Sequence, residues 1–228
     1  MRKVLAIQKK QWKETLKNKE ALIQFVMFPV MALIMTRSVK IPDVSGNFFV
    51  TLFAAMYVGM APLTSTASII AEEKEKNTLR ILRMSNVTAL QYLVSIGGYI
   101  MLMCLMGTAV FVVIGGYGGG DLVLFILVMT AGIMVSILIG AVIGLVCNSQ
   151  MSTAAAVIPV MLMFSFLPMI ATFNDQVKKI ADYVYSQQVS NILSGIGNTK
   201  PERGSFIIIG INFGLAAILF ATVYRRNK

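Results

Sequence analysis

The most highly charged stretch between two apolar segments is residues 71–89, which read AEEKEKNTLRILRMSNVTA. Acidic and basic side chains fill its first part, from Glu72 to Lys76. Apolar side chains then return, interrupted by two arginines; they are Leu79, Ile81, Leu82 and Met84. This pattern is typical of a short amphipathic helix that lies across a membrane face. A solvated helix extension with ordinary interfacial residues has the same composition, so composition alone does not decide between them.

The apolar segments lack the residues that catalysis or ion coupling would need. The chain has no histidine, and its long apolar segments contain no Asp, Glu, Lys or Arg. A charge at the centre of a bilayer costs about 2.5–3.5 kcal/mol, so membrane proteins keep one only where function needs it. The apolar segments therefore lack the residues for a proton relay or an intramembrane zinc protease. They also lack a base that could activate a serine nucleophile. The G-x-x-x-x-G-K-[ST] phosphate loop is also absent. We expect no catalytic residue, metal site or cofactor in this chain, and any energy must enter through another subunit.

The composition points to a membrane protein. Of 228 residues, 57% are hydrophobic and 13% are charged, whereas soluble domains carry about 25% charged residues. A soluble enzyme, an extracellular disulfide scaffold and a disordered tail are therefore excluded. The net charge of +10 could indicate nucleic acid, but the basic residues flank apolar segments, which is typical of topology signals. We expect no nucleic acid partner.

Six apolar segments are long enough to be transmembrane helices, which need about 20 residues. The predicted spans are residues 21–36, 48–70, 90–115, 122–147, 153–172 and 206–224. The first is short and could borrow residues from the helix before it. The basic residues 1–20, with Leu5, Trp12 and Leu16, predict an interfacial helix. We therefore expect one all-α polytopic membrane domain over residues 1–228, with an extracellular helical re-entrant segment over residues 173–205.

The basic residues also predict the orientation. With the N-terminus inside, 14 of the 20 Lys and Arg residues lie on the cytosolic side. Both termini are therefore expected in the cytosol, in a multi-pass protein of the cell membrane. No cleavable signal peptide is apparent, because no small-residue cleavage site clearly follows the first apolar run.

Several stretches in order resemble one family. The run EEKEKNTLRILRMSNVTALQYLVS resembles the first cytosolic loop of ABC type-2 exporter permeases, which have the ABCG-like architecture. Asn77-Thr78 stands where that family usually has Gly-Thr, and Ser85-Asn86-Val87 replaces its Ser/Thr-Pro turn. LIQFVMFPVMALIM is similar to the first span, which follows a basic interfacial helix. GLVCNSQMSTAAAVIPVMLMFSFLPM is similar to the tight polar turn between spans four and five.

The resemblance implies a partner and a site. Two six-span subunits, identical or different, would form a dimer, and a separate ATPase pair that binds ATP and Mg would dock on the cytosolic face. Residues 72–83 would be the coupling helix, and residues 1–20 would make a second, peripheral contact. For the N-terminal charges themselves, topology and attraction to anionic lipid are the favoured interpretation, and the contact is the alternative. The candidate ATPase contacts are Glu72, Glu73, Glu75, Asn77, Thr78, Leu79, Leu82 and Arg83.

A substrate path is predicted from prolines and methionines. Prolines that would kink helices stand inside spans one, two and five, which line the path in the resembled family; they are Pro29, Pro62, Pro159 and Pro168. Membrane helices tolerate proline generally, which is the alternative. Methionine suits promiscuous apolar surfaces. The candidate path residues are Met27, Met31, Met35, Met56, Met60, Met161, Phe164 and Met169. The alternative is that they face lipid or the helix core.

An uncharged, methionine-rich wall favours a hydrophobic or amphipathic cargo. An antimicrobial peptide or peptide toxin is the leading candidate, and a lipophilic drug or lipid fits the same wall. The second hypothesis is an energy-independent channel or a structural assembly protein, and the third is an ion-coupled carrier.

Two local features concern packing. Small residues recur every four positions at Gly132, Ser136, Gly140 and Gly144, and we interpret this face as packing inside one subunit. Thr88-Ala-Leu-Gln91 reads as a capping box that opens the third span. Cys104 and Cys147 are interpreted as packing residues.

Overall fold

The computed structural model describes residues 8, 11–12, 19–39, 46–78, 84, 88–197 and 202–226. Over these ranges the secondary structure is helical, without strands, as the sequence predicts. The helices are α2 (Lys19–Ser38), α3 (Phe48–Glu75), α5 (Ala89–Gly115), α6 (Gly119–Val146), α7 (Gln150–Phe173), α8 (Asp175–Ala181), α9 (Tyr185–Gly195) and α10 (Arg203–Arg226).

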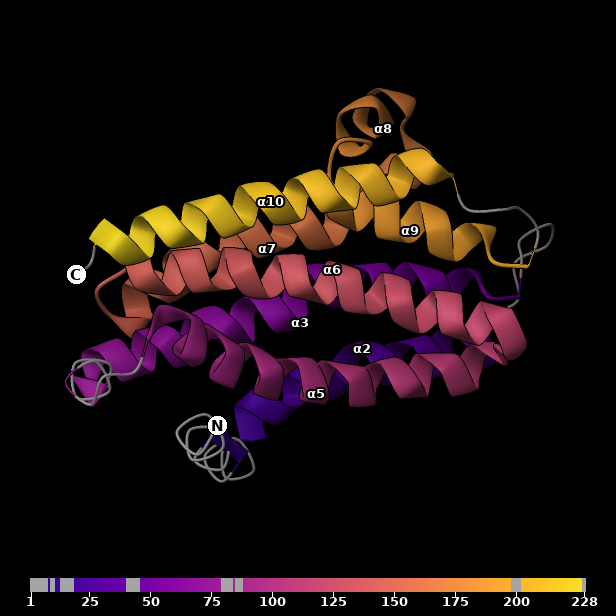
Figure 1. Cartoon of the computed structure of the whole chain (residues 1–228). Helices are drawn as coiled ribbons and strands as arrows, with labels where there is room; N and C mark the ends of the chain where they lie inside the picture. The colour runs from indigo at the N-terminus through magenta and orange to yellow at the C-terminus, as the bar shows by residue number, and fades with distance from the viewer. Residues whose placement is uncertain are drawn as a thin grey trace.

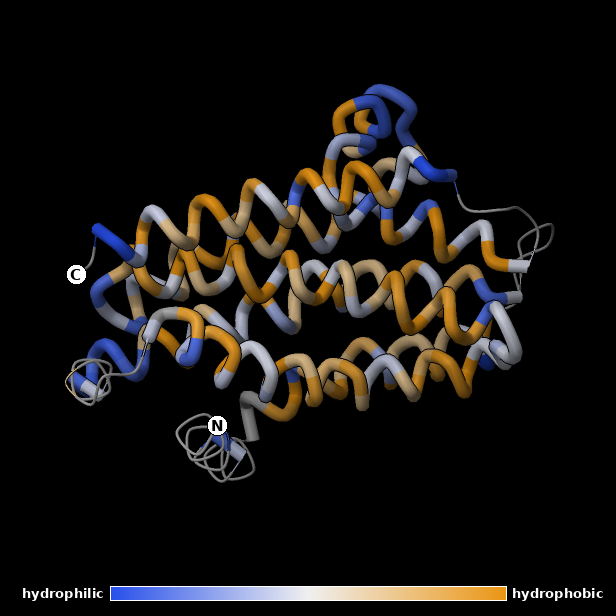
Figure 2. Tube along the Cα trace, viewed as in Figure 1, coloured by the Kyte–Doolittle hydropathy of each residue, from blue (hydrophilic) through white to orange (hydrophobic). Residues whose placement is uncertain are grey.

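Five of these helices, α3, α5, α6, α7 and α10, are long and apolar enough to cross a membrane. They coincide with the last five predicted spans. The first predicted span forms α2, whose apolar part, Leu22–Ser38, is shorter than the others. The six-span layout as a whole therefore stays a prediction. In Figure 2 the hydrophilic residues gather at the two ends of the bundle and in α8, as expected for helices that cross a bilayer.

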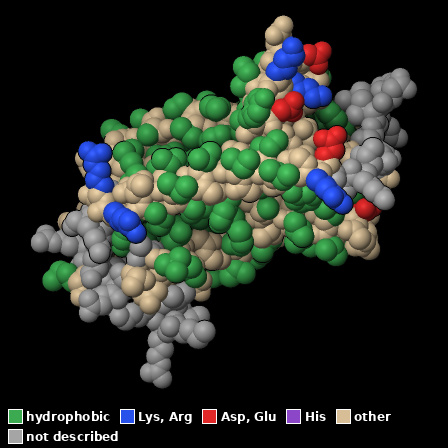
Figure 3. Space-filling view, turned by 45° about the horizontal axis from the view of Figure 1, so that its top comes forward, with side chains coloured by type: hydrophobic (Ala, Val, Ile, Leu, Met, Phe, Trp, Pro, Cys, Tyr) green, Lys and Arg blue, Asp and Glu red, His purple; other side chains and the backbone are tan. Residues whose placement is uncertain are grey.

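The long helices lie side by side, and α3 and α6 form their centre (Figure 1). α3 packs against α2, α5, α6, α7 and α9. In the most apolar 18-residue stretch of α3, 72% of the stretch is buried inside the bundle; the corresponding share is 22% in α7 and 17% in α10. The outer helices expose many apolar side chains, and they cover much of the face that Figure 3 shows. α3 is therefore the helix whose movement would disturb the most neighbours.

The small residues of α6 explain its close contact with α3. A Cβ atom on Gly144 would lie 2.8 Å from the carbonyl oxygen of Ala67, and one on Gly132 would lie 2.7 Å from Val58 Cγ1. A Cβ atom on Gly140 would meet the Leu63 carbonyl oxygen. Side chains larger than hydrogen would hold the two backbones apart. The prediction that this face packs inside one subunit is confirmed.

The fourth small residue, Ser136, compensates for a proline in α3. Pro62 has no N–H group, so the carbonyl oxygen of Val58, four residues earlier, loses its helical donor. Ser136 Oγ donates to that oxygen at 2.6 Å. Ser136 Oγ also lies 2.7 Å from the hydroxyl of Tyr185, which must then be the donor. Burial raises the pKa of Tyr185, which keeps this hydroxyl protonated. A three-member chain thus joins α3, α6 and α9.

The segment predicted as extracellular contains two short helices. α8 projects from the side of the bundle, whereas α9 packs against the bundle beside the first part of α10 (Figure 1). Tyr185, Val189 and Leu193 of α9 are buried. The predicted helical character of this segment is confirmed. We call this part of the molecule the α8–α9 end, and the opposite part, with the α3 C-terminus and the α6–α7 turn, the α6–α7 end.

Candidate ATPase-coupling site

The acidic run predicted to contact an ATPase forms the last turn of α3, and its three carboxylates face different surroundings. Glu72 pairs with Lys76 one turn later, and the two side chains are 39% and 64% exposed. Glu73 is only 3% exposed. Glu75 is exposed but reaches another helix. Glu72 and Glu75 therefore lie at the surface, whereas Glu73 lies inside the bundle.

Glu73 joins α3 to two other parts of the chain. Gln11 Nε2 donates to Glu73 Oε1 at 2.9 Å, and the hydroxyl of Tyr92 in α5 donates to Glu73 Oε2 at 2.7 Å. Gln11 and Tyr92 are also buried. A buried carboxylate is tolerated because each oxygen accepts a hydrogen bond, and bonds to a charged acceptor are the strong ones. Glu73 thus fixes α3 to α5 and to the N-terminal region.

Lys74 and Glu75 hold the turn between α6 and α7. Lys74 Nζ donates to the carbonyl oxygens of Leu145 at 2.8 Å and Cys147 at 2.7 Å, at the C-terminus of α6. Glu75 Oε2 accepts from the backbone N–H of Gln150 at 2.9 Å, at the start of α7. A cation at a helix C-terminus and an anion at a helix N-terminus both complement the helix dipole. The end of α3 is therefore clamped to two further helices.

The α6–α7 turn is itself shaped by capping. Ser149 is the N-cap of α7, and its hydroxyl accepts from the backbone N–H of Ser152 while Ser152 Oγ accepts from the backbone N–H of Ser149. This reciprocal pair satisfies donors that the first helical turn leaves open. The predicted tight polar turn is thus a rigid connection. The capping box predicted at Thr88 and Gln91 is also present and begins α5.

Asn77 ends α3 with a left-handed backbone, at φ 57°. Its N–H donates to the carbonyl oxygen of Lys74 at 3.1 Å. Glycine favours this conformation, and asparagine is one of the few other residues that adopts it readily. This explains how Asn77 can occupy the position where the resembled loop usually has glycine. The half-buried Thr78 follows directly.

The remaining predicted contacts fall outside the described residues: Leu79, Leu82 and Arg83. In the predicted N-terminal interfacial helix, the Trp12 ring packs edge-on against Tyr99 of α5, with 5.5 Å between ring centroids. Leu5 and Leu16 also fall outside the described residues.

This arrangement suits mechanical coupling more than catalysis. Its charged groups are engaged in structural bonds, and they join the end of α3 to α5, α6 and α7. Hydrogen bonds of charged side chains thus connect the end of α3 to three other helices.

A family model described as "ABC-2 family transporter protein" matches residues 4–225. The chain belongs to this ABC-2 family. The match covers nearly the whole chain and confirms the resemblance drawn from the sequence. ABC-2 chains are membrane subunits of ABC transporters, which implies an ATPase partner. A search of curated proteins finds no match.

The candidate path residues of this ABC-2 chain do not share one surface. Met27 and Met31 of α2 are 39% and 41% exposed, and Met169 of α7 is 37% exposed. Met35, Met60 and Met161 are half-buried. Met56, by contrast, is 5% exposed and packs in the core, and the Phe164 ring packs on Tyr185 with 5.1 Å between centroids.

Three of the four predicted kink prolines leave a carbonyl oxygen that faces a small residue on another helix. Pro62 frees the Val58 oxygen, which Ser136 binds. Pro168 frees the oxygen of Phe164, which would lie 2.7 Å from a Cβ atom on Gly59. Pro29 frees the oxygen of Phe25, 3.3 Å from a Cβ atom on Gly107. Pro159 is exposed on α7.

Sequence reasoning missed a polar contact between α2 and α3. Gln24 Oε1 accepts hydrogen bonds from Thr64 Oγ1 at 3.0 Å and Ser65 Oγ at 3.1 Å. The three side chains of this contact are uncharged, so a search for charged residues in the apolar segments does not find them. The signal was present in the sequence, since Gln24 interrupts the first apolar segment and Thr64, Ser65 and Thr66 interrupt the second.

Proposed function

We propose that this chain is the membrane subunit through which a separate ATPase drives export of a hydrophobic or amphipathic molecule. The single observation that carries the proposal is the clamp at the end of α3, where Lys74 and Glu75 hold the α6–α7 turn. Residues 72–83 then form the coupling segment, with both chain termini in the cytosol. Glu72 and Glu75 contribute to its outer surface, and Glu73 transmits movement to α5.

The coupling segment is tested by binding. Full-length protein carrying Leu79→Asp together with Leu82→Asp should lose co-purification with the ATPase, because apolar contacts at an interface centre dominate binding. The control is Leu102→Asp with Met106→Asp, two residues one turn apart on α5 that are each 50% exposed. Unchanged ATPase binding by the first variant, in correctly inserted protein, would show that the coupling segment is misplaced.

The clamp is tested separately from binding. Lys74→Met keeps the apolar stem of the side chain and removes its bonds to α6, so ATPase co-purification should persist while cargo-stimulated ATP hydrolysis falls. Lys179→Met is the matched control, because Lys179 is an exposed lysine on α8 at the other end of the bundle. Equal coupling in both variants would contradict the role of the clamp.

The cargo path is proposed to follow the exposed methionines of α2, and the leading cargo is an antimicrobial peptide or peptide toxin. A lipophilic drug or lipid fits the same wall. Met31→Asp should reduce export or cargo resistance, because an unpaired charge repels an apolar cargo. Leu102→Asp on the exposed face of α5 controls for membrane insertion. Export at the normal level by an inserted Met31→Asp protein would remove this residue from the path.

A second copy, or a related subunit, is proposed to cover the exposed face of α7. Leu162, Met163, Phe166, Leu167 and Ile170 line a shallow apolar groove of about 370 Å³ there. Crosslinking of Met163→Cys protein in membranes should give a dimer, whereas Leu215→Cys on α10 should not. The reverse result would place the dimer contact on α10.

Transport without an ATPase would favour the other hypotheses. Uptake into liposomes that follows a proton or sodium gradient indicates a carrier, and passive flux indicates a channel.

A further inference from the structure

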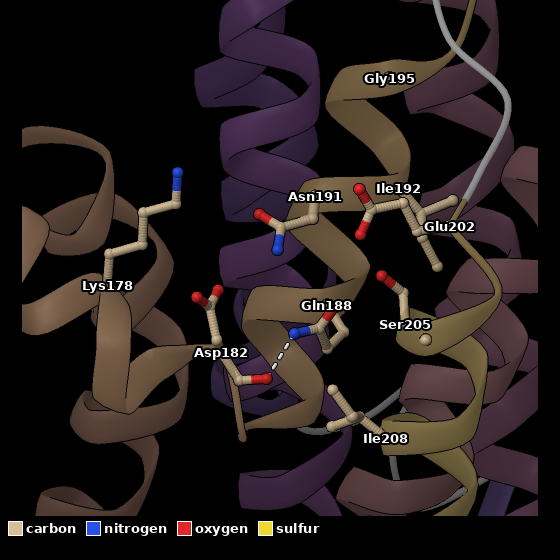
Figure 4. A pocket seen from close by; sticks show the side chains of 10 residues that line it. Lys178, Asp182, Gln188, Asn191, Ile192, Gly195, Glu202, Ser205 and Ile208 are labelled. Atoms are coloured by element: carbon tan, nitrogen blue, oxygen red, sulfur yellow. Dashed lines mark hydrogen bonds between the residues drawn. The ribbon is translucent and has the colours of Figure 1, made fainter.

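A polar pocket lies at the α8–α9 end, between α8, α9 and the start of α10. Its volume is about 490 Å³. Figure 4 shows Lys178 and Asp182 on one wall, Gln188 and Asn191 between the walls, and Glu202 and Ser205 on the opposite wall. The carboxylate of Glu202 points toward Asn191, into the pocket (Figure 4).

The charged side chains of this pocket differ from those at the α6–α7 end. Within the part of the chain that the structure describes, the side chains of Lys178, Asp182 and Glu202 form no hydrogen bond or ion pair. The chain has only ten acidic residues against 20 basic ones, and two of those acidic residues line this pocket. With Lys178 the charged lining residues sum to −1, and neither carboxylate forms an ion pair with it, which favours a ligand that carries a cationic group.

Ser205 provides an independent indication of a ligand. The residue is 5% exposed, and its hydroxyl oxygen, which makes no hydrogen bond within the described residues, is reached from the pocket. In Figure 4 this hydroxyl points into the pocket, toward Gln188. Gln188 is 4% exposed and is held in place because its Nε2 donates to the carbonyl oxygen of Asp182. The Ser205 hydroxyl is therefore free to bind a ligand or a water molecule in the pocket.

The surroundings of the pocket favour an amphiphile over a fully water-soluble ligand. Ile208 lines the pocket, and below it the same face of α10 carries Ile211, Leu215 and Leu219, which are 56%, 58% and 55% exposed. These residues follow one another at intervals of three and four, so they form one apolar stripe that begins at the pocket. A molecule with a polar head in the pocket could lay a hydrocarbon chain along this stripe.

We propose that this pocket binds the headgroup of an aminophospholipid in the outer leaflet. The primary ammonium group lies between Asp182 and Glu202 and donates to their carboxylates, to which the Ser205 hydroxyl adds a further partner. The phosphate faces Lys178, and an acyl chain follows α10. The outer-leaflet position rests on the proposed topology.

Lipid binding is measured on the purified full-length protein in detergent by native mass spectrometry. Phosphatidylethanolamine is compared with phosphatidylcholine and phosphatidylglycerol of identical acyl chains. Phosphatidylcholine is also zwitterionic, but its quaternary ammonium has no N–H donor. We expect phosphatidylethanolamine to bind about tenfold more tightly, which corresponds to one lost charge-assisted hydrogen bond. Equal binding of the two zwitterionic lipids would overturn the proposal.

Variants identify the site. Asp182→Asn with Glu202→Gln should abolish the preference for phosphatidylethanolamine, and Ser205→Ala should weaken it. Asp175→Asn is the matched control, because Asp175 is an exposed carboxylate of α8 that does not line the pocket. A preference that survives the double variant, or that disappears in the control, would place the lipid elsewhere. Tight binding of a lysine-rich peptide that phosphatidylethanolamine does not displace would assign the pocket to a peptide. Since the measurement needs no ATPase, its result is independent of whether the coupling experiments succeed.

Discussion

The two ends of the bundle differ in whether their charged side chains are bonded to other parts of the chain. At the α6–α7 end, Glu73, Lys74 and Glu75 are bonded to other helices or to the N-terminal region. At the α8–α9 end, the side chains of Asp182 and Glu202 line a pocket and bind no other described residue. Charges that are bonded internally make a stiff joint that can transmit force. Charges left unpaired are available to molecules from outside. The comparison predicts that substitutions at the two ends differ in their effect on stability.

The largest effect is expected at Glu73. Glu73→Ala removes the acceptor of two buried donors, Gln11 Nε2 and the Tyr92 hydroxyl. The free energy of unfolding should fall by about 3 kcal/mol, since each bond to a charged group contributes about 1.5–3 kcal/mol and the donors lose their partner. Unfolding in detergent by urea, followed by circular dichroism, measures this change.

The matched control for Glu73 is its neighbour. Glu72→Ala removes an exposed pair with Lys76 and should change the free energy of unfolding by less than about 0.5 kcal/mol. Similar losses in the two variants would mean that Glu73 does not act as a buried joint.

An intermediate effect is expected at Asn77. Asn77→Val places a β-branched residue at φ 57° and should cost about 1–2 kcal/mol, whereas Asn77→Gly should be neutral or slightly stabilising. The same unfolding measurement compares both variants with the wild-type protein. If the valine variant is as stable as the glycine variant, the left-handed turn is not needed to end α3.

The smallest effect is expected at the other end. Asp182→Asn with Glu202→Gln should leave the free energy of unfolding within about 0.5 kcal/mol of the wild-type value in lipid-free detergent, because no described partner is lost. Thermal unfolding with and without phosphatidylethanolamine checks this, and the lipid should stabilise only the wild-type protein. A large loss without lipid would mean that these carboxylates have a structural role, and the contrast between the ends would disappear.

The spans and the small-residue face were predictable because they depend on patterns within a single segment. Apolar runs of about 20 residues identify the long helices, and glycines four apart identify a close contact. The face of α6 with Gly140 and Gly144 packs as predicted.

The partners of the polar residues were not predictable, since they depend on which segments meet. Glu73 stands in a charged run that looks solvent-facing, yet Gln11, 62 residues earlier, buries one of its oxygens. The methionines show the same limit, because spacing places Met27 and Met56 on helices but does not say that Met56 is covered by neighbours.

The hydroxyl chain of Tyr185, Ser136 and the Val58 oxygen has a consequence for motion. A helix interrupted by proline can bend there without breaking a ladder bond, because the freed oxygen is held by a rotatable side chain. α3 can then bend at Pro62 into two parts of similar length, the second of which ends at the proposed coupling segment. Because Val58 lies in the first part and is joined through Ser136 to Tyr185, such a bend would move the end of α3 relative to α9 while the hydrogen-bond chain keeps the first part in place.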